Sequence, residues 1–200
     1  DGTDPKILRH ASTTGMSAET TEGAIFSSPD SRDDLWISPA NNHPDGFKEG
    51  VAVVKDAKGL FSLLNGKGEL VFGPKYQHIS EFSQGLAVVT ILGTRKDLWF
   101  LKGYIDPGGN EVIPPAFAEA EAFIDGIAIV REYDSFPFNA RFVDTKGEFL
   151  IGAAFQDARP FSEGVAAVKI DGLWGFIEKT GEIAIPPVFE GVGLFSEGIA

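Results

Sequence analysis

We predict an all-β protein made of stacked three-stranded repeats, and two observations in the 200-residue sequence support this fold class. The first is a Phe-x-x-Gly-x-Ala core that returns every 34 to 41 residues, a recurrence typical of repeat architectures. The second is the absence, from residue 47 to residue 200, of capped apolar segments with helical spacing. The five copies of the core begin at Phe47, Phe82, Phe123, Phe161 and Phe195.

The unit that follows Gly164 shows the elements of one repeat in order. The segment GVAAVKI is short, apolar and rich in β-branched residues, and the Asp-Gly pair after it predicts a tight hairpin. LWGFIE is a second predicted strand, KTG a second turn, and EIAIPP a third strand that prolines stop. Each unit is therefore predicted to be a three-stranded meander, followed by a loop of about ten residues that leads to the next unit.

Each position of the recurring core has a predicted structural role. The Phe buries a large apolar area between units, the Gly adopts a backbone conformation closed to other residues, and the small Ala lets a neighbouring sheet approach. The residue before the Gly is an acid or an amide, and because it recurs in every unit we expect it to serve the turn and not catalysis. These residues are Glu49, Gln84, Asp125, Glu163 and Glu197.

The last unit resembles the WG-repeat (KWG-repeat) family of bacterial proteins. The resemblance rests on Trp174-Gly175-Phe176-Ile177, Thr180-Gly181, Ile185-Pro186-Pro187 with Phe189, and Phe195-Ser196-Glu197-Gly198. It extends over about Trp36 to Ala200, although the Trp-Gly pair is replaced by Phe61-Ser62, Lys102-Gly103 and Ala140-Arg141 in the other units. It implies an all-β repeat fold and a binding or scaffolding module, and it implies no reaction.

The chain is predicted to have two parts. Residues 1–34 are polar and lack periodicity, which predicts an N-terminal arm. Residues 35–200 form the predicted repeat domain, with units that start near residues 47, 82, 123 and 161 and a partial unit from residue 195. The units could form an open, solenoid-like stack or close into a propeller-like ring. We favour the stack because the unit lengths vary.

Composition excludes several classes of function. The net charge of −12 argues against a nucleic-acid partner, because phosphate recognition needs a basic surface. No apolar run is long enough to span a membrane. The absence of cysteine excludes disulfides and thiolate chemistry. The chain begins at Asp1, which fits a removed signal peptide, a processed precursor or a trimmed chain, and we favour export.

We find no catalytic, cofactor-binding or metal-binding constellation in the sequence. The three histidines, His10, His43 and His78, are too scattered to suggest a ligand set. The Gly-rich segment DPGGNE lacks the Gly-Lys-Ser/Thr ending of a phosphate loop, and no Gly-x-Ser-x-Gly occurs. We therefore expect a protein that is not an enzyme and needs no cofactor.

Two insertions, Ile91 to Tyr104 in the second unit and Arg131 to Phe142 in the third, are the predicted binding surface. In repeat proteins, insertions map to loops on one face, and aromatic and arginine side chains dominate interaction hot spots. The alternative is that these aromatic side chains fold back on the core. The candidate partner-binding residues in the insertions are Arg95, Trp99, Phe100, Tyr104, Arg131, Tyr133, Phe136 and Phe138. The candidate anchors in the arm are Ile7, Leu8, Ile25 and Phe26.

These features favour a non-enzymatic protein–protein interaction module, an accessory or scaffold subunit of a larger and envelope-associated assembly. Two other functions stay open at the level of sequence. One is a domain that binds a glycan or another small ligand through exposed aromatic side chains. The other is the non-catalytic part of a larger enzyme.

Overall fold

The computed structural model describes residues 25–26, 35–37, 47–56, 58–93, 100–133 and 139–193. In this part of the chain there is no helix, and the strands form four antiparallel sheets, here numbered as layers one to four in chain order. Layer one contains β1 (Ile25–Phe26), β2 (Leu35–Ile37), β3 (Val51–Asp56), β4 (Phe61–Asn65) and β5 (Leu70–Tyr76). Layer two contains β6 (His78–Ile79), β7 (Ala87–Leu92), β8 (Phe100–Ile105) and β9 (Glu111–Phe117). Layer three contains β10 (Glu119–Ala120), β11 (Ile127–Arg131) and β12 (Ala140–Asp144). Layer four contains β13 (Asp157–Ala158), β14 (Val165–Ile170), β15 (Leu173–Glu178) and β16 (Ile183–Phe189).

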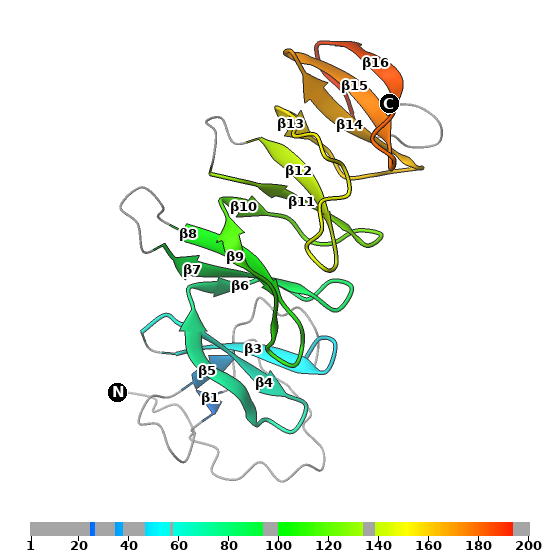
Figure 1. Cartoon of the computed structure of the whole chain (residues 1–200). Coiled ribbons are helices and arrows are strands. Elements are labelled where there is room, and N and C mark those ends of the chain that lie inside the picture. The colour runs from blue at the N-terminus through cyan, green and yellow to red at the C-terminus, as the bar shows by residue number, and fades with distance from the viewer. Residues whose placement is uncertain are drawn as a thin grey trace, which may run out of the picture.

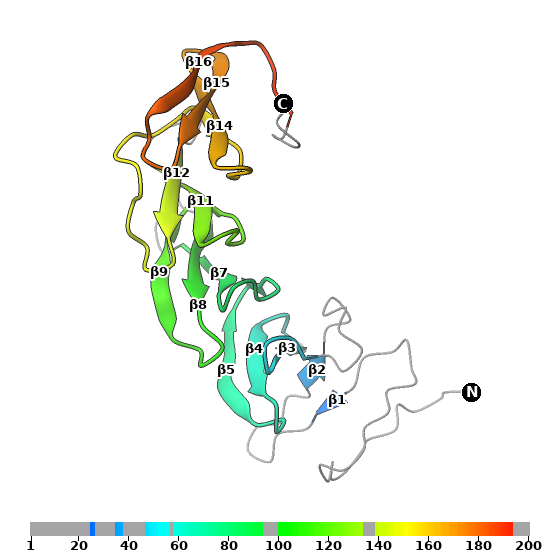
Figure 2. The ribbon, with the colours of Figure 1, turned by 90° about the vertical axis from the view of Figure 1, so that its right-hand side faces the viewer.

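The four layers form an open, gently curved stack. They follow one another in chain order, with layer one at the bottom of Figure 1 and layer four at the top, and Figure 2 shows the curvature. The first and fourth layers lie at opposite ends, so the described layers do not close into a ring. The prediction of an all-β repeat stack is therefore confirmed.

The hydrophobic core lies between the layers, because each sheet buries both of its faces. In β7, Ala87 and Val89 pack toward layer one while Val88 packs toward layer three. Alternation of side chains along a strand makes this two-sided burial possible. A single layer buries too little apolar area to be stable alone, so the stack is the folding unit.

The recurring phenylalanine and alanine are buried as predicted. Phe82, Phe123 and Phe161 each lie in the core between their own layer and the preceding one. Phe47 is only partly buried and packs against a smaller cluster in layer one. The buried alanines of the motif are Ala52, Ala87, Ala128 and Ala166. Phe195 and Ala200 lie outside the described residues.

The Phe-x-x-Gly segments are two-residue hairpins. Lys48 and Val51 exchange both backbone hydrogen bonds, at 2.8 and 3.1 Å, around Glu49 and Gly50, which have positive φ angles of 52° and 80°. Positive φ at both central residues defines the type I′ turn that matches strand twist. The second, third and fourth copies have the same geometry, so the predicted role of the glycine is confirmed at Gly50, Gly85, Gly126 and Gly164.

Two details of the predicted unit are wrong. The loop of about ten residues that we expected between units contains a two-residue strand, β6, β10 or β13, which pairs with the first long strand of the next layer. In layer three the expected third strand is reduced to two isolated bridges, Val143 with Phe149 and Ala140 with Phe155. The inter-unit segments thus belong to the sheets because they supply a fourth, short strand.

The glycine of the Trp-Gly pair is required by a close approach of backbone. A Cβ atom on Gly175 would lie 2.7 Å from the carbonyl oxygen of Ile185 and 2.7 Å from the nitrogen of Pro187. Gly103 faces its own Pro-Pro segment in the same way, with a closest distance of 2.4 Å. At both places the pairing register shifts, so the proline strand bulges over the glycine.

The predicted boundary between residues 1–34 and the repeat domain stays a prediction. β1 pairs with β2, and β2 pairs with β3 through Trp36 and Lys55, so the backbone of layer one includes two residues of the range assigned to the arm.

Candidate interaction surface

The strand ends that flank the two insertions lie at the same edge of the stack. Each insertion connects the first long strand of a layer to the second, β7 to β8 in layer two and β11 to β12 in layer three. We call this the insertion edge. The Phe-x-x-Gly hairpins and the Gly turns after β4, β8, β12 and β15 lie at the other ends of the same strands, which we call the turn edge.

The flanks of the two insertions are in contact. The hydroxyl of Tyr133 donates a hydrogen bond of 2.5 Å to the carbonyl oxygen of Phe100. Phe100 is the first residue of β8, and its side chain is 44% exposed. Directly opposite in the strand register lies Leu92, the last residue of β7, which is 58% exposed. The sequence does not single out Leu92, because nothing distinguishes it from other apolar strand residues.

Tyr104 is not part of this surface. Its side chain is fully buried, its ring centroid lies 4.8 Å from that of Phe123, and its hydroxyl donates a 2.7 Å hydrogen bond to the carbonyl oxygen of Glu121. Burial raises the pKa of Tyr104 well above its usual value near 10. Tyr104 therefore follows the alternative interpretation, in which the aromatic side chain folds back on the core, and its proposed role in partner binding is corrected.

Arg131 connects two layers. Its guanidinium pairs with Glu119 in its own sheet at 2.8 Å and with Asp157 of layer four at 2.7 Å, and only 17% of its side chain is exposed. These ion pairs hold Arg131 in the stack, which leaves it little surface to offer a partner.

Most other candidate residues cannot be placed. Arg95, Trp99, Phe136 and Phe138, together with Ile7 and Leu8, lie outside the described residues. Ile25 and Phe26 form β1, which is described by its backbone pairing with β2.

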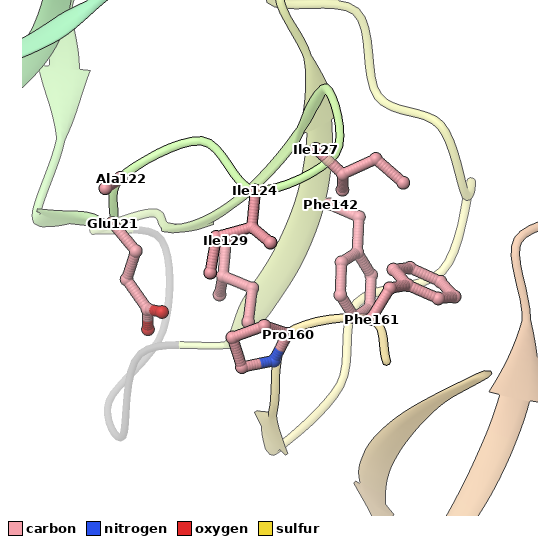
Figure 3. Close-up of a pocket in the computed structure, with 8 residues that line it drawn as sticks. All are labelled: Glu121, Ala122, Ile124, Ile127, Ile129, Phe142, Pro160 and Phe161. Atoms are coloured by element: carbon pink, nitrogen blue, oxygen red, sulfur yellow. The ribbon is translucent and has the colours of Figure 1, made fainter. Parts of the chain in front are cut away.

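The pockets on the described surface are small. One, shown in Figure 3, lies between layers three and four and is lined by apolar side chains such as Ile129, Phe142 and Phe161, with Glu121 at its rim. Its cavity volume is about 10 Å³, far below the range of about 300–1,000 Å³ typical of small-molecule sites. A second, more open hollow, with a cavity volume of about 180 Å³, lies beside Phe176 and Phe189 at the end of layer four.

The described residues lack two further kinds of feature. No group of three or more His, Asp or Glu side chains is placed to hold a metal ion there. Nor does this part of the chain contain a helix long and apolar enough to cross a membrane.

The stacked layers, the hairpins and the bulged proline strands define a β-repeat module. The family model for the WG containing repeat matches residues 61–93, 103–134, 141–174 and 174–200. The chain therefore belongs to the WG-repeat family, as its sequence motifs suggested. No curated protein matches the chain.

Proposed function

We propose that this chain is a non-enzymatic protein–protein interaction module, an accessory or scaffold subunit of a larger assembly, and that the insertion edge binds the partner. The proposal rests on one observation above all. At this edge Leu92 and Phe100, paired across β7 and β8, expose apolar side chains beside the hydrogen bond between Tyr133 and Phe100.

The chemistry of this surface favours a protein partner. Aromatic and large apolar side chains on a rigid strand pair lose little conformational entropy on binding and can enter a pocket of the partner. Neither of the two pockets described above has the volume of about 300–1,000 Å³ that sites for glycans or metabolites usually have. A surface of this kind therefore fits a protein better than a small ligand.

The test is a capture experiment from the source cells with three forms of the full chain. These are the wild type, the double variant Leu92→Ser/Phe100→Ser, and the matched control Leu70→Ser/Ile183→Ser. The control residues are also exposed, at 40% and 57%, but they begin β5 and β16 at the turn edge. Thermal unfolding of all three forms shows whether each variant is folded.

We expect a stoichiometric partner that the wild type and the control capture and the insertion-edge variant loses. Equal capture by the two variants would contradict the assignment of the surface. If no form captures a protein and the chain binds a glycan array instead, the interaction function is wrong and the ligand-binding alternative replaces it.

A further inference from the structure

Layers three and four are joined by an ion pair at a position that recurs in every layer. Arg131 lies in the first long strand of layer three, and Asp157 is the first residue of the short strand of layer four. Their side chains form the 2.7 Å ion pair that joins the layers. At this position, a cation of one layer is thus neutralised by a carboxylate of the next.

Layers one and two depart from this arrangement. Lys55 of layer one is equivalent to Arg131 of layer three. The short strand of layer two begins with His78, whereas the short strands of layers three and four begin with Glu119 and Asp157. Lys55 Nζ lies 5.3 Å from the ring centroid of Phe61, which is 5.6 Å from the His78 ring. The carboxylate that the repeat supplies elsewhere is replaced here by an imidazole.

A second departure adds another cation beside His78. Lys102 occupies in layer two the place that Phe61 has in layer one and Trp174 in layer four. In the strand register Thr90 pairs with His78 on one side and with Lys102 on the other, so the three residues lie side by side on neighbouring strands. In the described part of the chain no carboxylate forms an ion pair with Lys55, His78 or Lys102, as the salt bridges there involve other residues.

The titration of His78 agrees with this geometry. The pKa of His78 is lowered from 6.5, first by partial burial and then by the positive charges of Lys102 and Lys55. The imidazole therefore senses both lysines, one from each layer. The positive charges of both lysines disfavour a protonated His78.

We propose that Lys55, His78 and Lys102 form a binding site for the carboxylates of an acidic segment of the protein partner. This deepens the proposed function and rests on it. Lys102 and Phe100 are two residues apart on β8, so their side chains share one face of the strand. A segment in which acidic residues alternate with a large apolar residue would therefore contact the site and the apolar surface together.

The overall charge of −12 does not prevent this binding. Screening at physiological salt limits the repulsion from distant exposed acids to about 8 Å. Lys102 and Phe100 are two residues apart on β8, which places them within about that distance of each other.

The test uses fluorescein-labelled peptides and the full chain, with fluorescence anisotropy as the measurement. One peptide alternates Glu with Leu, the second replaces each Glu by Gln, and the third replaces each Glu by phosphoserine. The key variant is His78→Asp, which restores the carboxylate of the repeat next to Lys55, with His78→Asn as its neutral control. A second pair compares Lys55→Gln/Lys102→Gln with Lys67→Gln/Lys179→Gln, which removes the same charge at the turn edge.

We expect the Glu peptide to bind the wild type at least about tenfold more tightly than the Gln peptide, as removal of a paired charge does in other interfaces. His78→Asp and Lys55→Gln/Lys102→Gln should abolish this preference, and Lys67→Gln/Lys179→Gln should keep it. His78→Asn removes the imidazole without adding a negative charge, so it should reduce the preference less than His78→Asp does. Retained preference in the His78→Asp variant, with its fold intact by thermal unfolding, would overturn the site. Binding of the phosphoserine peptide alone would overturn the assignment to carboxylates.

The native partner separates the failure of this inference from the failure of the proposed function. If Leu92→Ser/Phe100→Ser loses the captured partner while His78→Asp keeps it, the interaction surface stands and the acidic-segment site is wrong. If neither change affects capture, the insertion edge itself is wrong.

Discussion

At the scale of the residue, the layers keep room for the close approach of two facing strands, although the residues that provide this room differ. Gly103 and Gly175 face Pro-Pro segments, but the same position holds Ser62 in layer one and Arg141 in layer three. In these two layers the first proline of the facing segment is replaced by glycine, Gly73 and Gly152. A proline would fix φ near −65°, whereas glycine lets the facing backbone take another path around the side chain. In layers one and three the glycine therefore lies in the facing segment instead of at the position of Gly103 and Gly175.

We predict that Gly175→Ala destabilises the fold by about 1–3 kcal/mol, the usual cost of forcing extra atoms into a packed site. The new Cβ atom would meet backbone at 2.7 Å, which no change of rotamer can relieve. Gly152→Ala is the control, because a Cβ there meets no atom within 4 Å. Urea unfolding of both variants measures the difference, and equal stabilities would refute the explanation of the Trp-Gly motif.

His78 offers a second prediction at this scale. In Lys102→Gln the pKa of His78 should rise toward 6.5 and stay below it, because partial burial is the larger cause of its lowered value. The measurement is an NMR titration of the imidazole. Lys67→Gln, at the turn edge, should leave the pKa unchanged, and an unchanged value in Lys102→Gln would show that Lys102 lies too far away.

At the scale of the element, neighbouring hairpins are linked by the residue that precedes the motif glycine. The backbone N–H of Gly85 donates a 3.1 Å hydrogen bond to the Glu49 carboxylate, and that of Gly126 donates a 2.8 Å bond to the side-chain oxygen of Gln84. This position therefore needs an acceptor oxygen, which both an acid and an amide provide. The sequence indicated a structural role for it, but not that its partner lies in the next unit, because the contact joins residues 36 and 42 positions apart.

Gln84→Leu should lower the free energy of unfolding by about 0.5–1.5 kcal/mol, the net contribution of one hydrogen bond. Gln84→Glu keeps the acceptor and should be close to the wild type. Thermal unfolding at neutral pH compares the three proteins. A loss of the same size in the two variants would show that the acceptor oxygen is not what matters.

The contact between layers one and two predicts a pH dependence. Glu111 accepts hydrogen bonds from Lys75 Nζ at 2.6 Å and from the Tyr76 hydroxyl at 2.9 Å, and the Lys75 bond is the main reason why its pKa lies below 4.5. A lowered pKa in the folded state stabilises the fold above about pH 4.5, and this contribution is lost as the pH falls through the folded value.

Glu111→Gln should therefore cost about 0.2–1 kcal/mol at pH 7, the range of exposed ion pairs, and less at pH 3. Chemical unfolding at the two pH values measures the cost. Glu148→Gln removes the same charge at the turn edge and is the control for a general effect of net charge. A cost for Glu111→Gln that is as large at pH 3 as at pH 7 would contradict this role of the ion pair.

At the scale of the whole molecule, recurrence in the sequence predicted the stack, the hairpins and the buried Phe and Ala positions. These features could be predicted because each layer needs the same hairpin and the same buried Phe and Ala, so the residues that form them recur in the sequence. Features that occur once were harder to predict. The burial of Tyr104 depends on which face of β8 meets layer three, and the exposure of Leu92 depends on where β7 ends. The unpaired cations around His78 emerge only when equivalent positions of different layers are compared in space.

The most direct test of the interaction surface is lysine-specific cross-linking of the chain bound to its captured partner, read out by mass spectrometry. The edges carry separate lysines: Lys55 and Lys102 lie toward the insertion edge, whereas Lys67, Lys146 and Lys179 lie in turns at the turn edge. We predict that cross-links to the partner involve Lys55 and Lys102. Cross-links confined to Lys67, Lys146 and Lys179 would place the partner at the turn edge and contradict the proposed surface.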